Sequence, residues 1–580
     1  MRALAKACLA VLLTSSLVVA QALPVMAASP AAVEANHGMV VSAHRLASEV
    51  GVEVLKSGGN AIDAAVAVGY ALAVVYPSAG NIGGGGFMTV RLKAGRTSFL
   101  DFRERAPQAA SKDMYLDASG NVVPGRSTAG YLAVGVPGSV AGFETALKRF
   151  GTLTRAAVMS PAIKLAREGF VLDDGDAAVF AGGANRLGKD PAASRIFLKD
   201  GKALIAGDRL VQTDLADSLA MISEGGTDAF YKGSIADKIV KASAARGGIL
   251  ATADFSAYKV RELAPITCQY RGYEIISSPP PSSGGVILCE ILNILEGYPL
   301  ADLGPGSAET VHDMVEAMRY AYADRNAALG DPDFVKNPVS TLLDKAYAAR
   351  IRASIAASRA GKSEAVKPLS LVESHETTHY SIVDDEGNAV SVTYTLNGSF
   401  GAGVVADGTG ILLNNEMDDF TSKPGVANLY GLVQGEANAI APGKTPLSSM
   451  SPTIITRDGK LFMVIGSPGG SRIITITLEA ILNVIDHGMT IAEAIDAPRI
   501  HHQWLPDKVV MEPFALSRDT QKILAGMGYD VGMDPNWTVW GQAAGILVGG
   551  DSLPAIAVGG GARLNGAMDV RSLTGKALGY

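Results

Sequence analysis

The chain of 580 residues has few cysteines, few aromatic residues and no long apolar run after its N-terminus. Its three cysteines form neither a CxxC pair nor a spacing with histidine that suits zinc, so a metal site has no support in the sequence. Because no stretch of ~18 uninterrupted apolar residues follows the N-terminus, we expect no membrane anchor in the mature protein.

Positive charge is also scarce. The chain has 50 Lys and Arg residues against 57 Asp and Glu residues, and its basic residues are interspersed with acidic ones. No basic run suited to tracking phosphates occurs, which argues against a nucleic-acid partner. With 48% apolar residues and 66 glycines, the composition is that of a globular protein and excludes disorder or a collagen-like repeat.

The N-terminus is typical of an export signal. Two basic residues precede an apolar run over residues 7–20, which is too short to anchor a protein in a membrane. Small residues predict cleavage after Ala27, which would remove residues 1–27, with Ala22 as the alternative. We therefore expect a periplasmic or secreted protein in which Cys268 and Cys289 remain as one potential disulfide.

Apolar patterns and turn residues predict the main elements. Helices are expected over residues 46–76, with a break at Gly58-Gly59, and over most of the region 147–360; strands are expected at 87–92 and 97–102. The glycine-rich run that precedes the first of these strands lacks the GxGxxG spacing and a following lysine. It is more typical of a tight turn beside a substrate pocket than of a phosphate loop.

A β-hairpin is predicted in the C-terminal part of the chain. Strand candidates at 378–384 and 388–396 flank a three-residue loop that ends in Gly387, the residue such turns favour at φ > 0. If the two strand ends beside this loop face each other, Thr377 lies opposite Thr395 and Asn397 follows on the same face. A one-residue bulge would change this register.

Thr377 is the candidate nucleophile of this hairpin. It follows an irregular polar segment, where a chain can be cut, and it begins a strand. A threonine freed at its N-terminus can use its own α-amine, with an ordinary pKa of ~8, as the general base. The alternative interpretation is that threonine is simply common in strands.

These residues resemble a known family. The run Thr377-Thr378-His379-Tyr380-Ser381, with NNEMDDF at 414–420, LSSMSP at 447–452 and GSPGGS at 466–471, is similar to the gamma-glutamyltransferases of the N-terminal-nucleophile superfamily. The resemblance implies an α+β fold, a four-layer αββα sandwich. It also implies self-cleavage between Glu376 and Thr377 into a large subunit, 28–376, and a small catalytic subunit, 377–580, which interlock as a heterodimer.

The resemblance assigns roles to individual residues. It implies that Thr377 is the nucleophile, that Thr395 orients it, and that the backbone N–H groups of Gly469 and Gly470 form the oxyanion hole. The residues implied to hold the substrate's α-amino group are Asn397, Glu416 and Asp419. Those implied to hold its α-carboxylate are Arg103, Ser448 and Ser449, and Tyr430 belongs to an implied lid.

The implied reaction transfers the γ-glutamyl group of glutathione or a related γ-glutamyl compound to water, an amino acid or a peptide, without a cofactor. An acylase of the same fold, for cephalosporin or glutaryl substrates, is the nearest alternative, but it would not need to hold an α-amino group. A binding or structural protein that keeps the fold without processing is the alternative from another class.

Overall fold

The computed structural model describes residues 29–366, 377–424, 426, 429, 435–534, 540–549 and 563–580. The predicted signal peptide, the cleavage-site residue Glu376 and the lid residue Tyr430 lie outside these residues. Within the described ranges, no helix is both long enough and apolar enough to span a bilayer.

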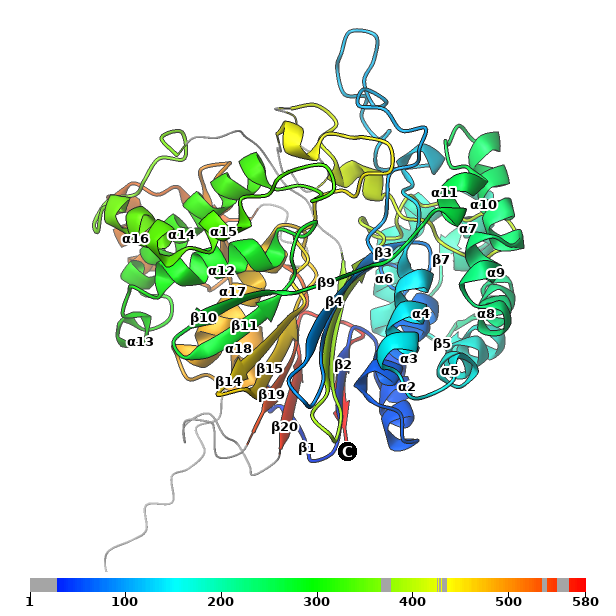
Figure 1. The fold of residues 1–580 in the computed structure, drawn as a ribbon, viewed down its shortest axis with the longest axis horizontal. Helices are drawn as coiled ribbons and strands as arrows, with labels where there is room; N and C mark the ends of the chain where they lie inside the picture. The colour runs from blue at the N-terminus through cyan, green and yellow to red at the C-terminus, as the bar shows by residue number, and fades with distance from the viewer. Residues whose placement is uncertain are drawn as a thin grey trace, which may run out of the picture.

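Two seven-stranded antiparallel sheets form the centre of the molecule (Figure 1). The first sheet contains, in spatial order, β21 (Lys576–Gly579), β2 (Met39–Ser42), β12 (Thr378–Val383), β13 (Ala389–Thr395), β3 (Gly85–Arg91), β4 (Thr97–Asp101) and β9 (Arg261–Leu263). The second contains β1 (Val33–Ala35), β20 (Leu564–Met568), β19 (Ala544–Val548), β15 (Lys460–Gly466), β14 (Thr453–Arg457), β11 (Tyr273–Ser277) and β10 (Ile266–Tyr270).

Helices cover the outer face of each sheet. The layer beside the first sheet comprises α2 (Arg45–Lys56), α3 (Ala61–Val75), α4 (Ser139–Phe150), α5 (Arg155–Glu168), α6 (Asp174–Leu187), α7 (Pro191–Phe197), α8 (Thr213–Gly225), α9 (Thr227–Tyr231), α10 (Ser234–Ala245) and α11 (Thr252–Ser256). The layer beside the second comprises α12 (Gly284–Leu295), α13 (Leu300–Leu303), α14 (Ala308–Ala328), α15 (Val339–Leu342), α16 (Lys345–Ser354), α17 (Arg472–Ile485), α18 (Ile491–Asp496) and α19 (Arg518–Met527). The predicted αββα sandwich is therefore confirmed.

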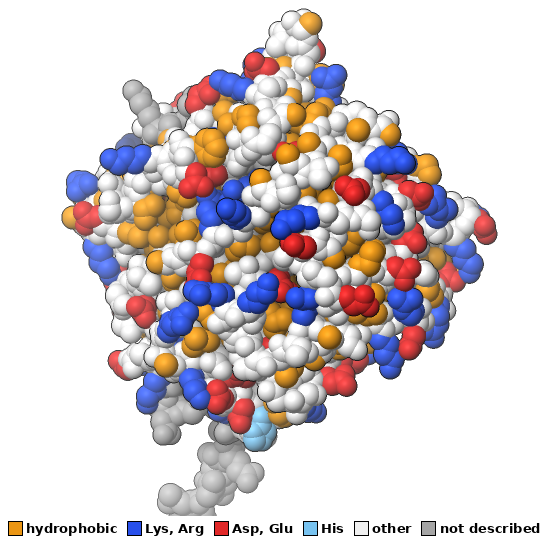
Figure 2. Space-filling view, turned by 45° about the vertical axis from the view of Figure 1, so that its right-hand side comes forward, with side chains coloured by type: hydrophobic (Ala, Val, Ile, Leu, Met, Phe, Trp, Pro, Cys, Tyr) orange, Lys and Arg blue, Asp and Glu red, His pale blue; other side chains and the backbone are white. Residues whose placement is uncertain are grey.

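Short elements complete the chain. They are β5 (Phe170–Val171), β6 (Leu198–Lys199), β7 (Lys202–Ala203), β8 (Arg209–Leu210), β16 (Ile500–His501), β17 (Val509–Met511) and β18 (Val531–Met533), with the 3₁₀ turns η1 (Tyr131–Ala133), η2 (Glu416–Asp419) and η3 (Glu436–Asn438). On the face seen in Figure 2, acidic and basic side chains are interspersed, as the sequence predicts.

The apolar composition of α3 and α12 explains why both lie in the interior. All residues of each helix are buried, because neither helix has a polar face to expose to solvent. Asn60 caps α3 through a capping box with Asp63, which satisfies the first N–H groups of this buried helix. Helix α3 packs on β13 and α12 on β10, so each fixes one sheet from outside.

Each of the two sheets contains strands from before and from after Thr377. In the first sheet, β12 lies between β2 and β13, and β13 pairs in turn with β3. In the second, β14 pairs with β11, which comes from the earlier part of the chain. The segments before and after Thr377 therefore share both sheets and form no separate domains.

The predicted hairpin and its register are confirmed, although the strands are one and two residues shorter than predicted. Strands β12 and β13 pair Thr378 with Tyr394 and continue without a bulge to Val383 and Ala389, and Gly387 has φ of 85°. The first predicted helical region is also confirmed as α2 and α3, separated near Gly58-Gly59.

The prediction of a mainly helical region over 147–360 was incomplete. It contains β10 and β11, which belong to the second sheet. The signal was the hairpin turn Arg271-Gly272, whose φ values of 48° and 84° suit a tight connection between two strands rich in β-branched and aromatic residues.

Cys268 on β10 and Cys289 on α12 form a disulfide. The bond joins an edge strand of the second sheet to the helix that covers it, 21 residues later in the chain. Cross-linking a loop of this length restricts the unfolded chain and stabilises the fold by about 3 kcal/mol in the chain-entropy model.

Replacing Cys268 by serine should therefore lower the thermal midpoint of unfolding. Because the restriction on the unfolded chain is lost, we expect the free energy of unfolding, measured by denaturant titration, to fall by about 3 kcal/mol. Reductant should lower the stability of the wild-type protein by a similar amount and leave the variant unchanged. Equal stability of oxidised wild type and variant would contradict this role.

Candidate active site

A small pocket lies where β13 ends and the turn after β15 begins. Every predicted catalytic or substrate-binding residue except Gly469 lines it, and Gly469 directly precedes the lining residue Gly470. The lining residues are Arg103, Arg325, Thr377, Thr395, Asn397, Glu416, Asp419, Leu447, Ser448, Ser449, Met450, Gly470, Ser471 and Ile473. Seven separate stretches of the chain, from Arg103 to Ile473, therefore meet at one place.

The hairpin positions the two threonines of the pocket. Thr377 directly precedes β12 and Thr395 ends β13, so continuing the observed register places them opposite each other. Both are buried, with 7% and 2% of their surface exposed. The Thr395 hydroxyl accepts a hydrogen bond from the backbone N–H of Asn397 at 2.8 Å, which ties the end of the strand to the next pocket residue.

His379 is the described histidine nearest to Thr377 in sequence, and its side chain forms its contacts inside the sandwich. Its ring nitrogens lie 2.9 Å from the Thr393 hydroxyl and 3.1 Å from the Ser381 hydroxyl. Burial lowers the pKa of His379 to about 3, so the ring stays neutral in this network. The ring is therefore occupied by partners within the sheet and is a poor candidate for the general base.

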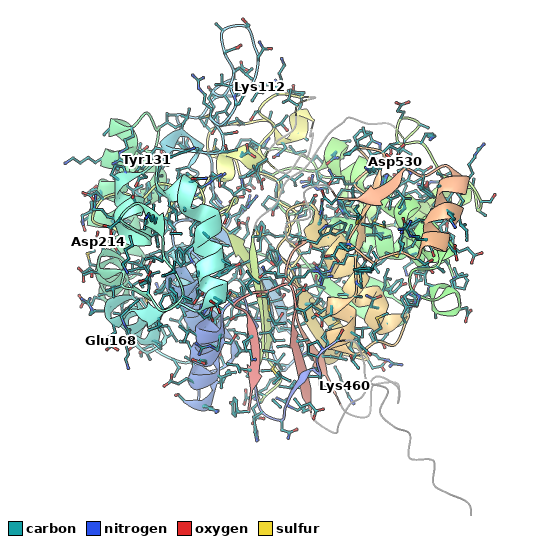
Figure 3. All side chains as sticks on the ribbon, turned by 180° about the vertical axis from the view of Figure 1, so that it is seen from behind. Lys112, Tyr131, Glu168, Asp214, Lys460 and Asp530 are labelled. Atoms are coloured by element: carbon teal, nitrogen blue, oxygen red, sulfur yellow. A yellow bond between two sulfur atoms is a disulfide. The ribbon has the colours of Figure 1, made fainter. Side chains whose placement is uncertain are left out.

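The glycines of the GSPGGS run form the turn between β15 and α17. Figure 3 labels Lys460, the first residue of β15, at the far end of the strand from this turn. Gly469 and Gly470 have φ of 135° and 56°, a conformation that side chains disfavour. Their carbonyls accept the N–H groups of Arg472 and Ile473, so the turn leads directly into the positive end of the α17 dipole. This placement suits the binding of an anion by backbone N–H groups.

Arg103 is buried among carboxylates. It lies just after β4 and forms ion pairs with Glu416 and Asp419, both of which belong to η2. A third carboxylate, that of Glu104, lies 3.9 Å from the guanidinium. One cation therefore faces three carboxyl groups in a site with little access to water.

Desolvation opposes the ionisation of these carboxyl groups. Burial raises the pKa of Glu104 to about 7, and it also raises the pKa values of Glu416 and Asp419, in each case against the opposing effect of Arg103. The nearby charges of Glu104 and Asp419 raise the pKa of Glu416 further, because like charges disfavour ionisation. The pocket thus holds a charge balance that a charged ligand would change.

A buried loop supports the two pocket serines. Ser283, in the loop that precedes α12, donates a hydrogen bond to the Ser448 carbonyl at 2.7 Å, and Ser448 donates its N–H to the carbonyl of Pro281. The Ser449 hydroxyl accepts a hydrogen bond from Arg325 at 2.8 Å. These contacts fix the serines beside Met450 in the pocket wall.

Arg325 was missed by the sequence analysis. It is the last basic residue of α14 and is fully buried, with hydrogen bonds to Ser283, Asn326 and Ser449. The sequence offers only a mixed-charge helix at this position, which is typical of a solvated surface. A second arginine in the pocket therefore becomes visible only in the folded structure.

The glycine-rich run after α3 packs beneath Thr395. A side chain at Gly84 would place its Cβ 2.0 Å from the Thr395 carbonyl, and one at Gly83 would lie 2.1 Å from the Leu412 carbonyl. Asn414 donates hydrogen bonds to the carbonyls of Gly83 and Gly135 and accepts the N–H of Glu416. The predicted tight backbone beside the pocket is confirmed, and it anchors η2.

The segment between β4 and α4 that contains Lys112 and Ser127 forms a projecting loop, which contacts η2 and η3. Within it, Ser127 donates a 2.5 Å hydrogen bond to Asp418, the residue next to Asp419. Lys112, labelled at the projecting end of the molecule in Figure 3, pairs with Glu436 of η3 at 2.8 Å. The loop therefore holds both 3₁₀ turns from outside.

Comparison with known families agrees with this geometry. The family model described as "Gamma-glutamyltranspeptidase" matches residues 47–577. The chain belongs to the gamma-glutamyltranspeptidase family. The match spans every residue that lines the pocket.

Individual relatives support the same membership. The chain is 61% identical to the "Glutathione hydrolase proenzyme" of Pseudomonas sp. (strain A14), over 96% of each chain. It is 50% identical to the protein of the same name from Escherichia coli (strain K12), over 94% of this chain and 93% of the relative. Its fold is similar to that of cephalosporin acylase from Bacillus halodurans, with a TM-score of 0.83, 28% identity and coverage of 97% and 98%.

The carboxyl group of Glu104 makes the stability of this family member depend on pH. Its pKa of about 7 in the folded protein exceeds the ordinary value of 4.5, so the folded state retains a proton that the unfolded state has released. The stability from this proton is present below pH 4.5 and is lost as pH rises through 7. Between pH 4.5 and 7.5, the melting temperature of Glu104→Gln should therefore fall less than that of the wild type. Parallel curves for the two proteins would contradict this assignment.

Proposed function

We propose that the chain is a self-processing γ-glutamyltransferase and glutathione hydrolase. The observation that carries the proposal is the placement of Arg103 with Glu416 and Asp419 in the pocket that also contains Thr377. A guanidinium beside two carboxylates matches the opposite charges of an amino-acid head group. Its family membership and the names of its relatives support the same reaction.

Substrate binding exchanges one set of ion pairs for another. The α-carboxylate of the γ-glutamyl group takes a place on Arg103 and accepts hydrogen bonds from Ser448 and Ser449. The α-ammonium group is held by Asp419, Glu416 and Asn397. Because one positive and one negative charge enter together, the net charge of the buried site does not change, which keeps the cost of desolvation low.

Thr377 then carries out the chemistry. Its hydroxyl oxygen attacks the γ-amide carbonyl while its own α-amine accepts the hydroxyl proton, and Thr395 orients the hydroxyl. Backbone N–H groups of Gly469 and Gly470 stabilise the oxyanion. The C–N bond breaks as the amine leaves with the proton, and a γ-glutamyl ester remains on Thr377. Water, an amino acid or a peptide then attacks this ester; no step requires a cofactor.

Activation requires a free amine on Thr377. We propose that the precursor cleaves itself between Glu376 and Thr377, giving fragments 28–376 and 377–580. Both fragments contribute strands to each sheet, so the fragments remain together as a heterodimer after the cut. The N-terminal segment 1–27 directs export to the periplasm or the medium.

An acylase for glutaryl or cephalosporin substrates is the second candidate, favoured by the shared fold of the cephalosporin acylase and by 42% identity to the "Acylase ACY 1 proenzyme" of Pseudomonas sp. (strain V22). Such substrates need not have an α-ammonium group, so they would leave Asp419 and Glu416 without a substrate partner. A non-enzymatic binding protein, in turn, would have no use for the paired threonines beside an anion-binding turn.

Self-cleavage is tested by intact mass and N-terminal sequencing. The wild type should give two fragments, the smaller beginning Thr377-Thr378-His379, and Thr377→Ala should stay a single chain because it lacks the attacking hydroxyl. Ser381→Ala is a matched control that removes a hydroxyl from the same strand and should still be cut. An uncut wild-type protein would overturn the proposed mechanism.

Substrate choice is tested by comparing γ-glutamyl and glutaryl p-nitroanilides, which differ in the α-ammonium group. Asp419→Ala should lower kcat/KM for the γ-glutamyl substrate by about 10²–10³-fold, because a buried charge pair is lost. Turnover of the glutaryl substrate should change far less. Asp407→Ala, which removes an exposed carboxylate, is the control and should affect neither substrate. Equal losses for both substrates with Asp419→Ala would favour the acylase.

A further inference from the structure

A second cavity lies between α14, α17 and the segment that follows α18. Its volume is about 180 Å³, against about 20 Å³ for the Thr377 pocket, and the two share no lining residue. A protein cavity of ~150 Å³ is large enough to hold benzene. Helix α17 connects the two sites, since Ile473 at its start lines the Thr377 pocket and Leu482 near its end lines the second cavity.

The walls of the second cavity are mainly apolar. Val311 and Met314 contribute from α14, Leu482 from α17, and Ile500 and Leu516 from the segments beyond α18. All five are buried, so the space is set into the helical layer rather than formed by a surface groove. Such walls suit the apolar body of a small molecule.

Two polar atoms at this cavity have no hydrogen-bond partner among the described residues. They are Oε1 of Glu479 and Nδ1 of His487, and both residues line the cavity. The other carboxyl oxygen of Glu479 accepts the N–H of Ile500 at 3.2 Å, which fixes the side chain. Buried polar atoms without partners are costly, so a ligand that pairs with both atoms would gain affinity.

The charged groups around Glu479 do not supply its partner. Arg499, Arg571 and Glu512 lie near enough to influence it. Arg499 pairs with Asp569 at 2.5 Å, and Arg571 pairs with Glu512 at 2.6 Å, so each arginine is balanced by another carboxylate. Burial raises the pKa of Glu479 to about 8 and lowers that of His487, so both groups are mainly neutral near pH 7.

An exposed aromatic side chain directly precedes two residues that line the cavity. Phe514 is 95% exposed and has φ of 67°, and the next residues, Ala515 and Leu516, line the cavity. A phenylalanine held in the left-handed region and turned toward solvent is unfavourable for folding alone.

We propose that this cavity binds a small, mainly apolar primary amine. The apolar body lies among the side chains of α14 and α17, and the ammonium group donates hydrogen bonds to Oε1 of Glu479 and Nδ1 of His487. An ammonium group has three N–H donors, which is enough for both atoms. Glu479 releases its proton to solvent as the ammonium group binds, and its carboxylate then neutralises the charge of the ligand. This site is separate from the γ-glutamyl reaction and does not depend on it.

The probe is 4-bromobenzylamine, whose bromine can be located in crystals of the full-length processed enzyme by anomalous diffraction. We expect bromine between α14 and α17. Measured by calorimetry, amine binding should weaken at least tenfold in Glu479→Gln, which removes the charge. It should weaken by the same factor in Ala515→Phe, which places a larger side chain in the cavity lining while Glu479 remains. Glu224→Gln, on the exposed face of α8, is the matched control and should bind as the wild type does.

Neutral 4-bromobenzyl alcohol tests the charge of the ligand and should bind at least tenfold more weakly than the amine. Bromine only in the Thr377 pocket, or at no site, would overturn the proposal. Equal affinity of the alcohol and the amine, or unchanged amine binding in both cavity variants, would overturn it as well. If Glu479→Gln fails to fold, Ala515→Phe and the alcohol still decide the outcome.

Discussion

The antiparallel pairing of β12 with β13 is the constraint on which the candidate active site depends. Continued by one residue, its register places Thr377, which directly precedes β12, opposite Thr395, which ends β13. Neighbouring strands β2 and β3 come from the earlier part of the chain and enclose the hairpin on both sides. A cut before Thr377 would therefore create a new N-terminus without releasing the strand that carries it.

The second constraint is the low access of water to Arg103. Its carboxylate partners come from a 3₁₀ turn more than three hundred residues later, held in place by Asn414 and by the hydrogen bond between Ser127 and Asp418. In such surroundings an unbalanced charge is costly, so a zwitterionic head group fits better than a single anion or cation. The same desolvation that raises the pKa of Glu104 thus contributes to substrate selection.

Local patterns predicted much of the fold. The register of the hairpin followed from Gly387 and strand alternation, because a short loop leaves few ways to pair two strands. The β10–β11 hairpin was overlooked because it lies among helices and because exposed and half-buried residues alternate along most of its edge strand, β10. Most pocket residues came from the family resemblance, and the structure now shows that they lie together. The position of Arg325 in the pocket depends on the packing of α14 against the loop before α12, and no local sequence pattern predicts this packing.

The central claim is that the Thr377 hydroxyl carries the γ-glutamyl group during turnover. The most direct measurement is mass spectrometry of the enzyme quenched in acid during steady-state turnover of a γ-glutamyl anilide, followed by peptide mapping. The account predicts that the small fragment gains the mass of one γ-glutamyl group, located on the N-terminal peptide at Thr377 and removed by adding an acceptor amino acid. A γ-glutamyl adduct on any other residue, with Thr377 unmodified, would contradict the account.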